Sequence, residues 1–227
     1  MQTAYVFMAL TGGLVPALFW LWFWLREDRA HPEPKRLIIS SFIAGMAVVS
    51  LVLPLQRFAM ERFGETDLML VWVIIEEVLK YSAALIVVLW NKQVDEPIDA
   101  IIYMIAIALG FSALENTLFI FAPLSSGNIA ESILTSQFRF VGATLLHVLA
   151  SGTVGAMMAF AFYKSKFARI AYATLGLCIA IVLHAVFNFS IMNAKGETLL
   201  SIFMFVWLGI IILFLVFEKA KRIRRST

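Results

Sequence analysis

The sequence predicts an all-α polytopic membrane protein with about seven transmembrane helices. Its 227 residues are 62% hydrophobic and 15% charged, with a mean hydropathy of +0.90, whereas a soluble domain carries about 25% charged residues. A folded chain this small cannot hide so much apolar surface from water. The composition therefore excludes a soluble enzyme and a disordered tail. The single cysteine, Cys178, excludes an intrachain disulfide.

Apolar segments long enough to cross a bilayer follow one another from one end of the chain to the other. Crossing about 30 Å of hydrocarbon takes roughly 20 helical residues. Helices are expected because the backbone N–H and C=O groups at an open sheet edge would have no hydrogen-bond partners in lipid. The predicted spans are residues 3–25, 36–57, 68–90, 98–122, 138–163, 169–191 and 198–218. Polar or Pro/Gly-bearing breaks separate them, among them residues 26–35, 58–67 and 123–126. We interpret residues 1–227 as a single transmembrane domain.

Basic residues predict how these spans are oriented. The start of the chain, Met1-Gln2-Thr3, lacks the basic region of a cleavable signal peptide, so the first apolar stretch is expected to remain as a span. With the N-terminus outside, thirteen lysines and arginines fall in inside loops and four in outside loops. This bias predicts a cytoplasmic C-terminus, where the basic run 219–225 is expected to lie among anionic lipid headgroups.

Six ionisable residues lie inside the predicted spans, where such side chains are costly and by default indicate function. They are Glu76, Glu77, Lys80, Glu115, His147 and His184. At about 1.5 Å per residue, the glutamates and histidines lie roughly 10–14 Å below the outer boundary. Four antiparallel helices thus bring them to one level, which predicts a single site in the outer half of the membrane.

Local spacing refines this site. Glu76 and Lys80 are i,i+4 neighbours and can form an ion pair that lets the helix tolerate its charges. One lysine cannot neutralise Glu76 and Glu77 together, so the paired carboxylates favour acid–base chemistry. His184 and Asn188 also share a face. Asn188 either bonds a neighbouring helix or donates to a developing oxyanion.

Two kinds of hydrolytic chemistry fit these residues. Glu115, His147 and His184 can supply the three ligands of a catalytic zinc, leaving Glu76 or Glu77 as general base. Alternatively, a glutamate activates water without metal, assisted by histidine. The HExxH motif of the common zinc proteases is absent, and no aspartate lies deep in a span. A Ser112–His184 dyad would leave the glutamates unexplained.

In their order on successive helices, these residues resemble the PrsW family of intramembrane proteases. The matching motifs are Glu76-Glu77-x-x-Lys80, Phe111-x-x-x-Glu115, His147 and His184-x-x-x-Asn188, together with the loop 28–34 (sequence DRAHPEP). The resemblance covers nearly the whole chain. It implies proteolysis within a prokaryotic plasma membrane, and in PrsW itself the first cut of an anti-sigma factor on its extracytoplasmic side.

The PrsW family is similar to the wider superfamily of CAAX prenyl endopeptidases and bacteriocin-processing enzymes, which carry the pattern EExxxR, FxxxH and HxxxN. Lys80 stands one position before the expected arginine and Glu115 replaces the histidine, which argues against a prenyl-protein substrate. Carried over, the resemblance implies that Glu76 activates water with Glu77 beside it, and that His184 and Asn188 stabilise the oxyanion. Glu115 and His147 complete the site or bind metal, and Lys80 and Phe111 support it.

Two other functions are compatible with the residues. A proton-coupled transporter or channel also uses intramembrane glutamates and histidines, but it needs polar residues through the full membrane depth, and the inner half shows almost none apart from Lys80. A non-catalytic scaffold would retain the site without using it. The partners expected are a membrane-protein substrate and the lipid bilayer, and no nucleic acid.

Overall fold

The computed structural model describes residues 2–27, 32–194 and 197–224, and within these ranges it is helical with no strand. The elements are α1 (Gln2–Glu27), α2 (Lys35–Met60), α3 (Glu65–Ala84), the π-helical turn η1 (Leu85–Leu89), α4 (Pro97–Ser125), α5 (Ile129–Phe138), the π-helical turn η2 (Arg139–Ala143), α6 (Thr144–Phe160), α7 (Lys166–Met192) and α8 (Glu197–Ala220). The predicted all-α polytopic fold is confirmed.

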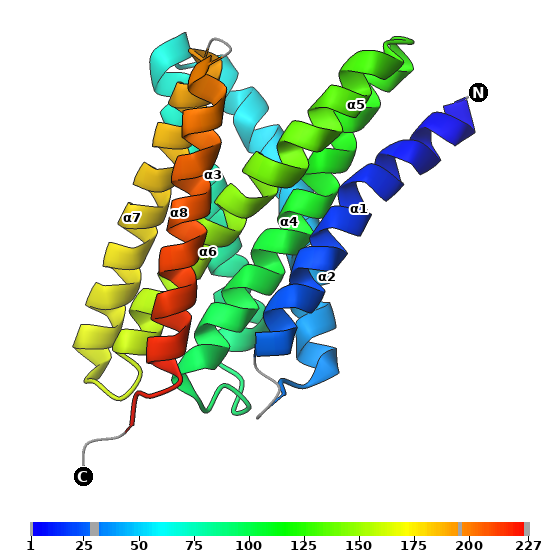
Figure 1. Cartoon of the computed structure of the whole chain (residues 1–227). Helices are drawn as coiled ribbons and strands as arrows, with labels where there is room; N and C mark the ends of the chain where they lie inside the picture. Colours follow the sequence, from blue (N-terminus) through cyan, green and yellow to red (C-terminus); the bar gives the residue numbers. More distant parts are fainter. Residues whose placement is uncertain (1, 28–31, 195–196, 225–227) are drawn as a thin grey trace.

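Six stretches of the described chain are long and apolar enough to cross a membrane: residues 2–27, 35–60, 97–125, 129–160, 166–192 and 198–220. The seventh predicted span corresponds to α3 and η1, which together cover residues 65–89, about 37 Å of helix. It is less apolar because it carries Glu76, Glu77 and Lys80. Successive long helices run in alternating directions through the bundle (Figure 1). Which end faces the cytoplasm stays a prediction.

One predicted boundary is misplaced. The span predicted at 138–163 begins nine residues earlier, at Ile129, and ends at Phe160. Residues 129–137 contain several polar side chains and lie outside the predicted spans, but a turn at Gly127 (φ +80°) and the Asn128 side chain, which accepts from the Glu131 N–H at 3.1 Å, start a helix there. Residues 28–31 of the family-like loop, Lys195 and Arg225 lie outside the described residues.

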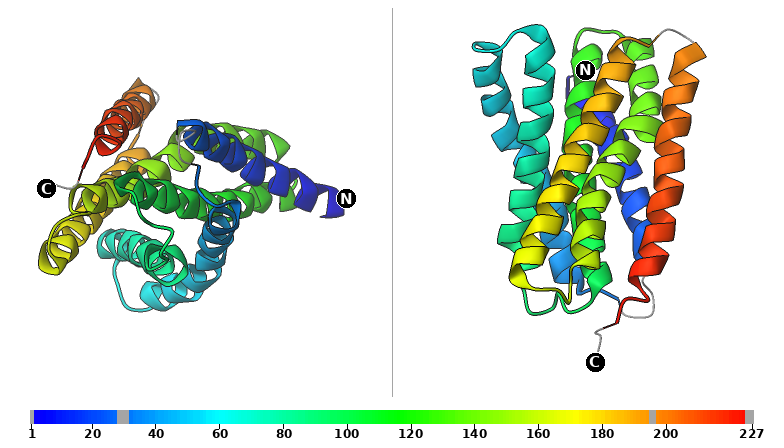
Figure 2. Two further views of the ribbon diagram at one scale, coloured as in Figure 1. Left: turned by 90° about the horizontal axis from the view of Figure 1, so that it is seen from below. Right: turned by 90° about the vertical axis from the view of Figure 1, so that its left-hand side faces the viewer.

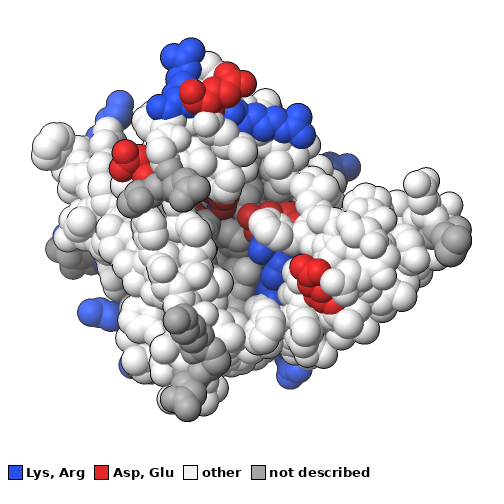
Figure 3. All heavy atoms as spheres, turned by 90° about the horizontal axis from the view of Figure 1, so that it is seen from above, with Lys and Arg blue, Asp and Glu red and all other residues white. Residues whose placement is uncertain are grey.

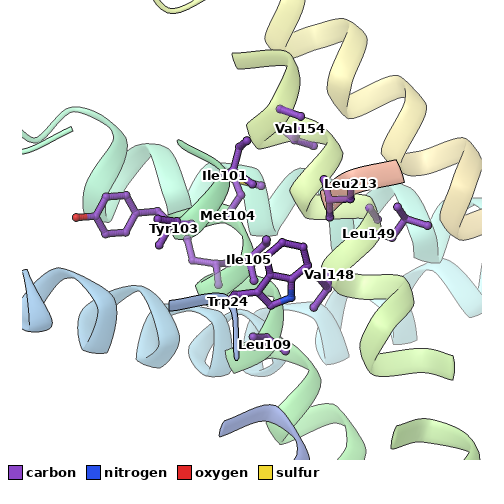
Figure 4. Close-up of a cluster of buried hydrophobic side chains, with 14 of the residues drawn as sticks. Trp24, Ile101, Tyr103, Met104, Ile105, Leu109, Val148, Leu149, Val154 and Leu213 are labelled. Carbon is purple, nitrogen blue, oxygen red and sulfur yellow. The ribbon is translucent and has the colours of Figure 1, made fainter. Parts of the chain in front are cut away.

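Helix α4 is the centre of the bundle. It is apolar on every side and almost completely buried, as expected for a helix enclosed by others. Figure 2 shows the other helices around it, and Figure 4 shows the packed core around its N-terminal half. The core side chains come from α1, α4, α6 and α8: Trp24, Ile101, Met104, Ile105, Leu109, Val148, Leu149, Val154 and Leu213.

Helices α2 and α4 touch backbone to backbone through two glycines. A Cβ at Gly45 would collide with the Ile107 carbonyl, and one at Gly110 with the Phe42 carbonyl. Such reciprocal glycines let membrane helices approach closely. Beyond this contact the two helices diverge toward the end that carries the α2–α3 connection (Figure 1), so the contact fixes the angle at which α2 leaves the central helix.

Candidate functional site

Four helices bring the predicted site residues together in the half of the bundle beyond the glycine contact. Helix α3 carries Glu76, Glu77 and Lys80, α4 carries Phe111 and Glu115, α6 carries His147, and α7 carries His184 and Asn188. Hydrogen bonds and ring contacts link all four helices through these side chains. The fold therefore brings these side chains to the same height in the bundle, as their positions along the predicted helices indicated.

Lys80 is the buried cation at the base of the site. Its Nζ donates to Glu77 Oε1 at 2.6 Å and to His147 Nδ1 at 3.0 Å, and it lies 4.3 Å from the centroid of the Phe111 ring. The predicted i,i+4 pair with Glu76 is thus replaced by an i,i+3 pair with Glu77. Because a buried charge needs a partner, this pair lets Lys80 lie at zero exposure.

His184 stands between the two neighbouring glutamates. Its Nδ1 lies 2.8 Å from Glu77 Oε1, and its Nε2 lies 3.9 Å from Glu76 Oε2. Glu76 is held on its other oxygen, where Gln56 Nε2 donates to Oε1 at 3.0 Å. Glu76 Oε2 itself is buried and has no hydrogen-bond partner. A carboxylate oxygen and a ring nitrogen therefore face each other across a short gap.

Glu115 is held from the opposite side by Arg139. The Arg139 guanidinium donates to Glu115 Oε2 and to Asn116 Oδ1, and it lies 4.0 Å from the Phe119 ring centroid. His147 Nε2 bonds the same Glu115 oxygen at 3.0 Å. Arg139 begins η2, and π-helical turns inside longer helices are frequent at functional sites.

A cavity of about 400 Å³ lies beside these groups, between α3, α4, α6, α7 and α8. Its walls include Glu76, Glu115, Arg139, His184 and Asn188. Seen from the end that carries the α2–α3, α4–α5 and α7–α8 connections, the surface is hollowed at its centre, with acidic and basic atoms in the hollow (Figure 3). Glu77 is absent from the lining and only 1% exposed, against 8% for Glu76 and 17% for Glu115.

The set of possible metal ligands differs from the predicted one. Among the described residues, Glu76, His147 and His184 offer ligand atoms that all lie within 4.8 Å of one another. Glu76 thus takes the place of Glu115, whose carboxylate is bonded to Arg139 and His147. Helical spacing could not decide between the two glutamates, because both lie at the same level and differ only in the direction from which they approach.

The serine–histidine dyad weighed from the sequence is not formed. Ser112 Oγ donates to Thr144 Oγ1 at 3.1 Å, and Asn116 Nδ2 donates to the same hydroxyl at 2.9 Å. Ser112 and Asn116 therefore join α4 to α6 in a buried polar contact, and Asn116 also accepts from Arg139.

The site also contains two residues that the sequence motifs do not indicate, Arg139 and Gln56. The basic-residue count places Arg139 among the outside charges, yet both residues lie just inside predicted spans. A polar side chain within a span is expected to face the protein interior, so this position is the signal for both. The structure places Arg139 on Glu115 and Gln56 on Glu76.

Together these features define a polytopic membrane protein with a buried site of carboxylates and histidines beside a cavity. The chain belongs to the PrsW family: the family model described as "PrsW family intramembrane metalloprotease" matches residues 33–217. It is similar to Protease PrsW of Bacillus subtilis (strain 168), with 27% identity covering 96% of this chain and 97% of the relative. It is also similar to Protease PrsW of Clostridioides difficile (strain 630), with 30% identity covering 79% and 77%. No solved structure shows significant similarity.

The chain is accordingly an intramembrane protease, integral to a prokaryotic plasma membrane and acting on a membrane-protein substrate. The predicted protease function is confirmed, and the transporter alternative gains no support from these relatives.

Proposed function

We propose that this protease hydrolyses peptide bonds with the help of a divalent metal ion, zinc, held by Glu76, His147 and His184. The observation that carries the proposal is the 3.9 Å gap between Glu76 Oε2 and His184 Nε2, on one side of which the carboxylate oxygen is buried without a partner. Imidazole and carboxylate are the ligands of catalytic zinc sites, and the family description as a metalloprotease agrees with this choice.

The hydrogen bonds around His184 explain why a cation fits this gap. Glu77 Oε1 can only accept, so the Nδ1 atom that it faces carries the proton. His184 Nε2 then presents a lone pair toward Glu76 Oε2, which also presents lone pairs. Two facing acceptors repel each other, and either a proton or a metal cation between them removes the repulsion. Glu77 is thereby a positioning residue, the carboxylate that orients a ligating histidine.

His147 is oriented by charges on both sides. Lys80 can only donate, so His147 Nδ1 accepts from it and His147 Nε2 donates to Glu115. In this tautomer only Nδ1 carries a lone pair, so His147 would join the ligand set when Lys80 releases its hydrogen bond to Nδ1. Because Lys80 retains its bond to Glu77 at 2.6 Å, the lysine stays paired when it gives up His147.

The residues that line the cavity provide the rest of the chemistry. When bound, the metal ion lowers the pKa of its water and polarises the peptide carbonyl. Glu115, fixed by Arg139 and open to the cavity, accepts the proton of the attacking water. Asn188 lines the same cavity one turn beyond His184, and its amide donates to the carbonyl oxygen as negative charge develops there.

Metal content and activity measured on the same preparations test this proposal. We expect about one zinc per purified chain, with zinc and cleavage both lost in Glu76→Gln and His184→Ala. Glu61→Gln, a change of an exposed glutamate at the end of α2, is the matched control and should change neither. Full activity in chelator-treated, metal-free protein would refute the metal site and leave Glu76 as the water-activating base. Undiminished cleavage in both variants would refute the site itself.

The positions of the site and of the substrate also belong to this proposal. The basic-residue bias and the helix spacing support a site in the outer half of the membrane. The substrate class that the resemblance implies is an anti-sigma protein cut near its extracytoplasmic side. The basic residues at the end of α8 and just after it, Lys219, Lys221 and Arg222, support contact of this end of the chain with anionic headgroups.

A further inference from the structure

The carboxylates of the site border two cavities. Gln56, Glu76, Glu115 and Phe119 line both the 400 Å³ cavity described above and a second cavity of about 260 Å³. The second cavity is formed by α2 and α4, whereas the first is bounded largely by α3 and by the helices from α5 to α8. These four side chains therefore form the partition between two approaches to the same reacting groups.

The second cavity is an apolar groove that faces the lipid. Its walls are Val49, Val52 and Leu53 on α2 and Leu118 and Ala122 on α4. Leu53 is 40% exposed and Leu118 39% exposed, so the groove opens sideways at the surface that a bilayer covers. We call it the α2–α4 groove.

The divergence of α2 from α4 accounts for the groove. The helices are in backbone contact at Gly45 and Gly110, and Gln56 lies 11 residues further along α2, about 16 Å from that contact. Over this length α2 leans away from α4 (Figure 1). A lateral opening that leads to Glu76 and Glu115 is thus built into the crossing of the two helices.

We propose that the α2–α4 groove admits an apolar, extended segment of the membrane-protein substrate to the carboxylates, while water reaches them from the larger cavity. The inference rests on the proposed function. Gln56 and Phe119, which face both spaces, separate the lipid side from the water side and open as the segment enters.

The chemistry of the groove favours an extended segment. In an α-helix the peptide groups are hydrogen-bonded to one another and enclosed by the side chains, so Glu76 and Glu115 at the end of the groove can reach a peptide bond only where the segment is extended. An extended segment exposes backbone polar groups that lipid cannot satisfy. The polar end of the groove, formed by Gln56, Glu76 and Glu115, is where such groups find partners. A substrate span must therefore unwind locally to reach the site.

Tryptophan substitutions on the groove walls test this route. The probe is a single-span anti-sigma protein from the same host, reconstituted with the protease in phosphatidylethanolamine–phosphatidylglycerol vesicles, beside a soluble peptide carrying the same cleavage sequence. We expect Leu53→Trp and Ala122→Trp to lower the ratio of membrane-protein cleavage to peptide cleavage by about ten-fold or more. Leu51→Trp is the matched control, because Leu51 is also an exposed leucine of α2 but does not line the groove, and its ratio should equal that of the wild type.

An occupancy measurement separates this inference from the proposed function. In a Cys178→Ser background, Leu53→Cys and Leu51→Cys are compared for disulfide cross-linking to a cysteine placed in the span of the same probe. This readout needs no catalysis. Cross-linking at Leu53 in clear excess over Leu51 supports the groove even if the wild type fails to cleave. Equal cross-linking at both positions, or a cleaving wild type whose Leu53→Trp ratio is unchanged, would overturn the lateral route and leave the protease assignment intact.

Discussion

Replacing Lys80 with methionine should both destabilise the protein and disable the site. Lys80 Nζ lies 2.6 Å from Glu77 Oε1, and neither side chain is more than 1% exposed. At an effective dielectric constant of about 20, unit charges at this distance attract by about 6 kcal/mol. Burying the two charges costs desolvation free energy, so the pair stabilises the protein by less than this attraction. Lys80→Met nevertheless leaves the buried Glu77 charge without its cation, with the hydrogen bond from His184 as its remaining contact. The free energy of unfolding should therefore fall by about 3–5 kcal/mol.

A double-mutant cycle measured by SDS unfolding in mixed micelles tests this reasoning. Glu77→Gln alone should also destabilise the protein, because it removes the carboxylate that pairs Lys80 and anchors His184. The double variant should cost clearly less than the sum of the single variants, with a coupling energy of about 2–3 kcal/mol. Lys92→Met, at an exposed position, is the control and should stay within about 0.5 kcal/mol of wild type. Additive effects, or a loss below about 1 kcal/mol for Lys80→Met, would refute the buried pair.

Three further predictions concern the scaffold and the second charge pair. Gly110→Ala should lower the free energy of unfolding in the same micelles by about 1–3 kcal/mol, because the added Cβ would collide with an α2 carbonyl. Gly64→Ala is the control: its Cβ would have no atom within 4 Å, so the free energy of unfolding should change little. Arg139→Lys should slow cleavage about ten-fold while circular dichroism stays native, because lysine cannot reproduce the two-point guanidinium contact; an unchanged kcat would contradict this. Tyr103→Phe removes the hydroxyl that donates to Glu33 and should lower the free energy of unfolding by about 1–3 kcal/mol. It should not slow cleavage, since Tyr103 lies about 18 Å along α4 from Glu115; slower cleavage would show that the N-terminal end of α4 is coupled to the site.

Much of the fold was predictable because a bilayer imposes strict rules on a sequence. Hydrophobic length located the helices to within a few residues, except where Asn128 caps a helix whose first turns are polar. The same rules made Glu76, Glu115, His147 and His184 conspicuous, since each is a costly side chain in an apolar span. Their depth followed from counting residues, and the structure places them together.

What the sequence left open depends on how the helices are rotated and where they diverge. Depth alone could not decide that Lys80 pairs with Glu77 and not with Glu76, nor that Glu76 and not Glu115 faces His184. It also could not show that Arg139, which begins a π-helical turn, bonds Glu115.

The sequence by itself thus determined the class of fold, the residue types of the site and the level at which they meet, because hydrophobicity and the 1.5 Å rise per residue are local properties of each helix. Only the tertiary structure decided which side chains pair with one another in the site. The rotation of each helix and the Gly45–Gly110 contact are set by packing between segments far apart in the chain. That packing leaves Glu76 Oε2 unpaired opposite His184 and opens the α2–α4 groove beside it.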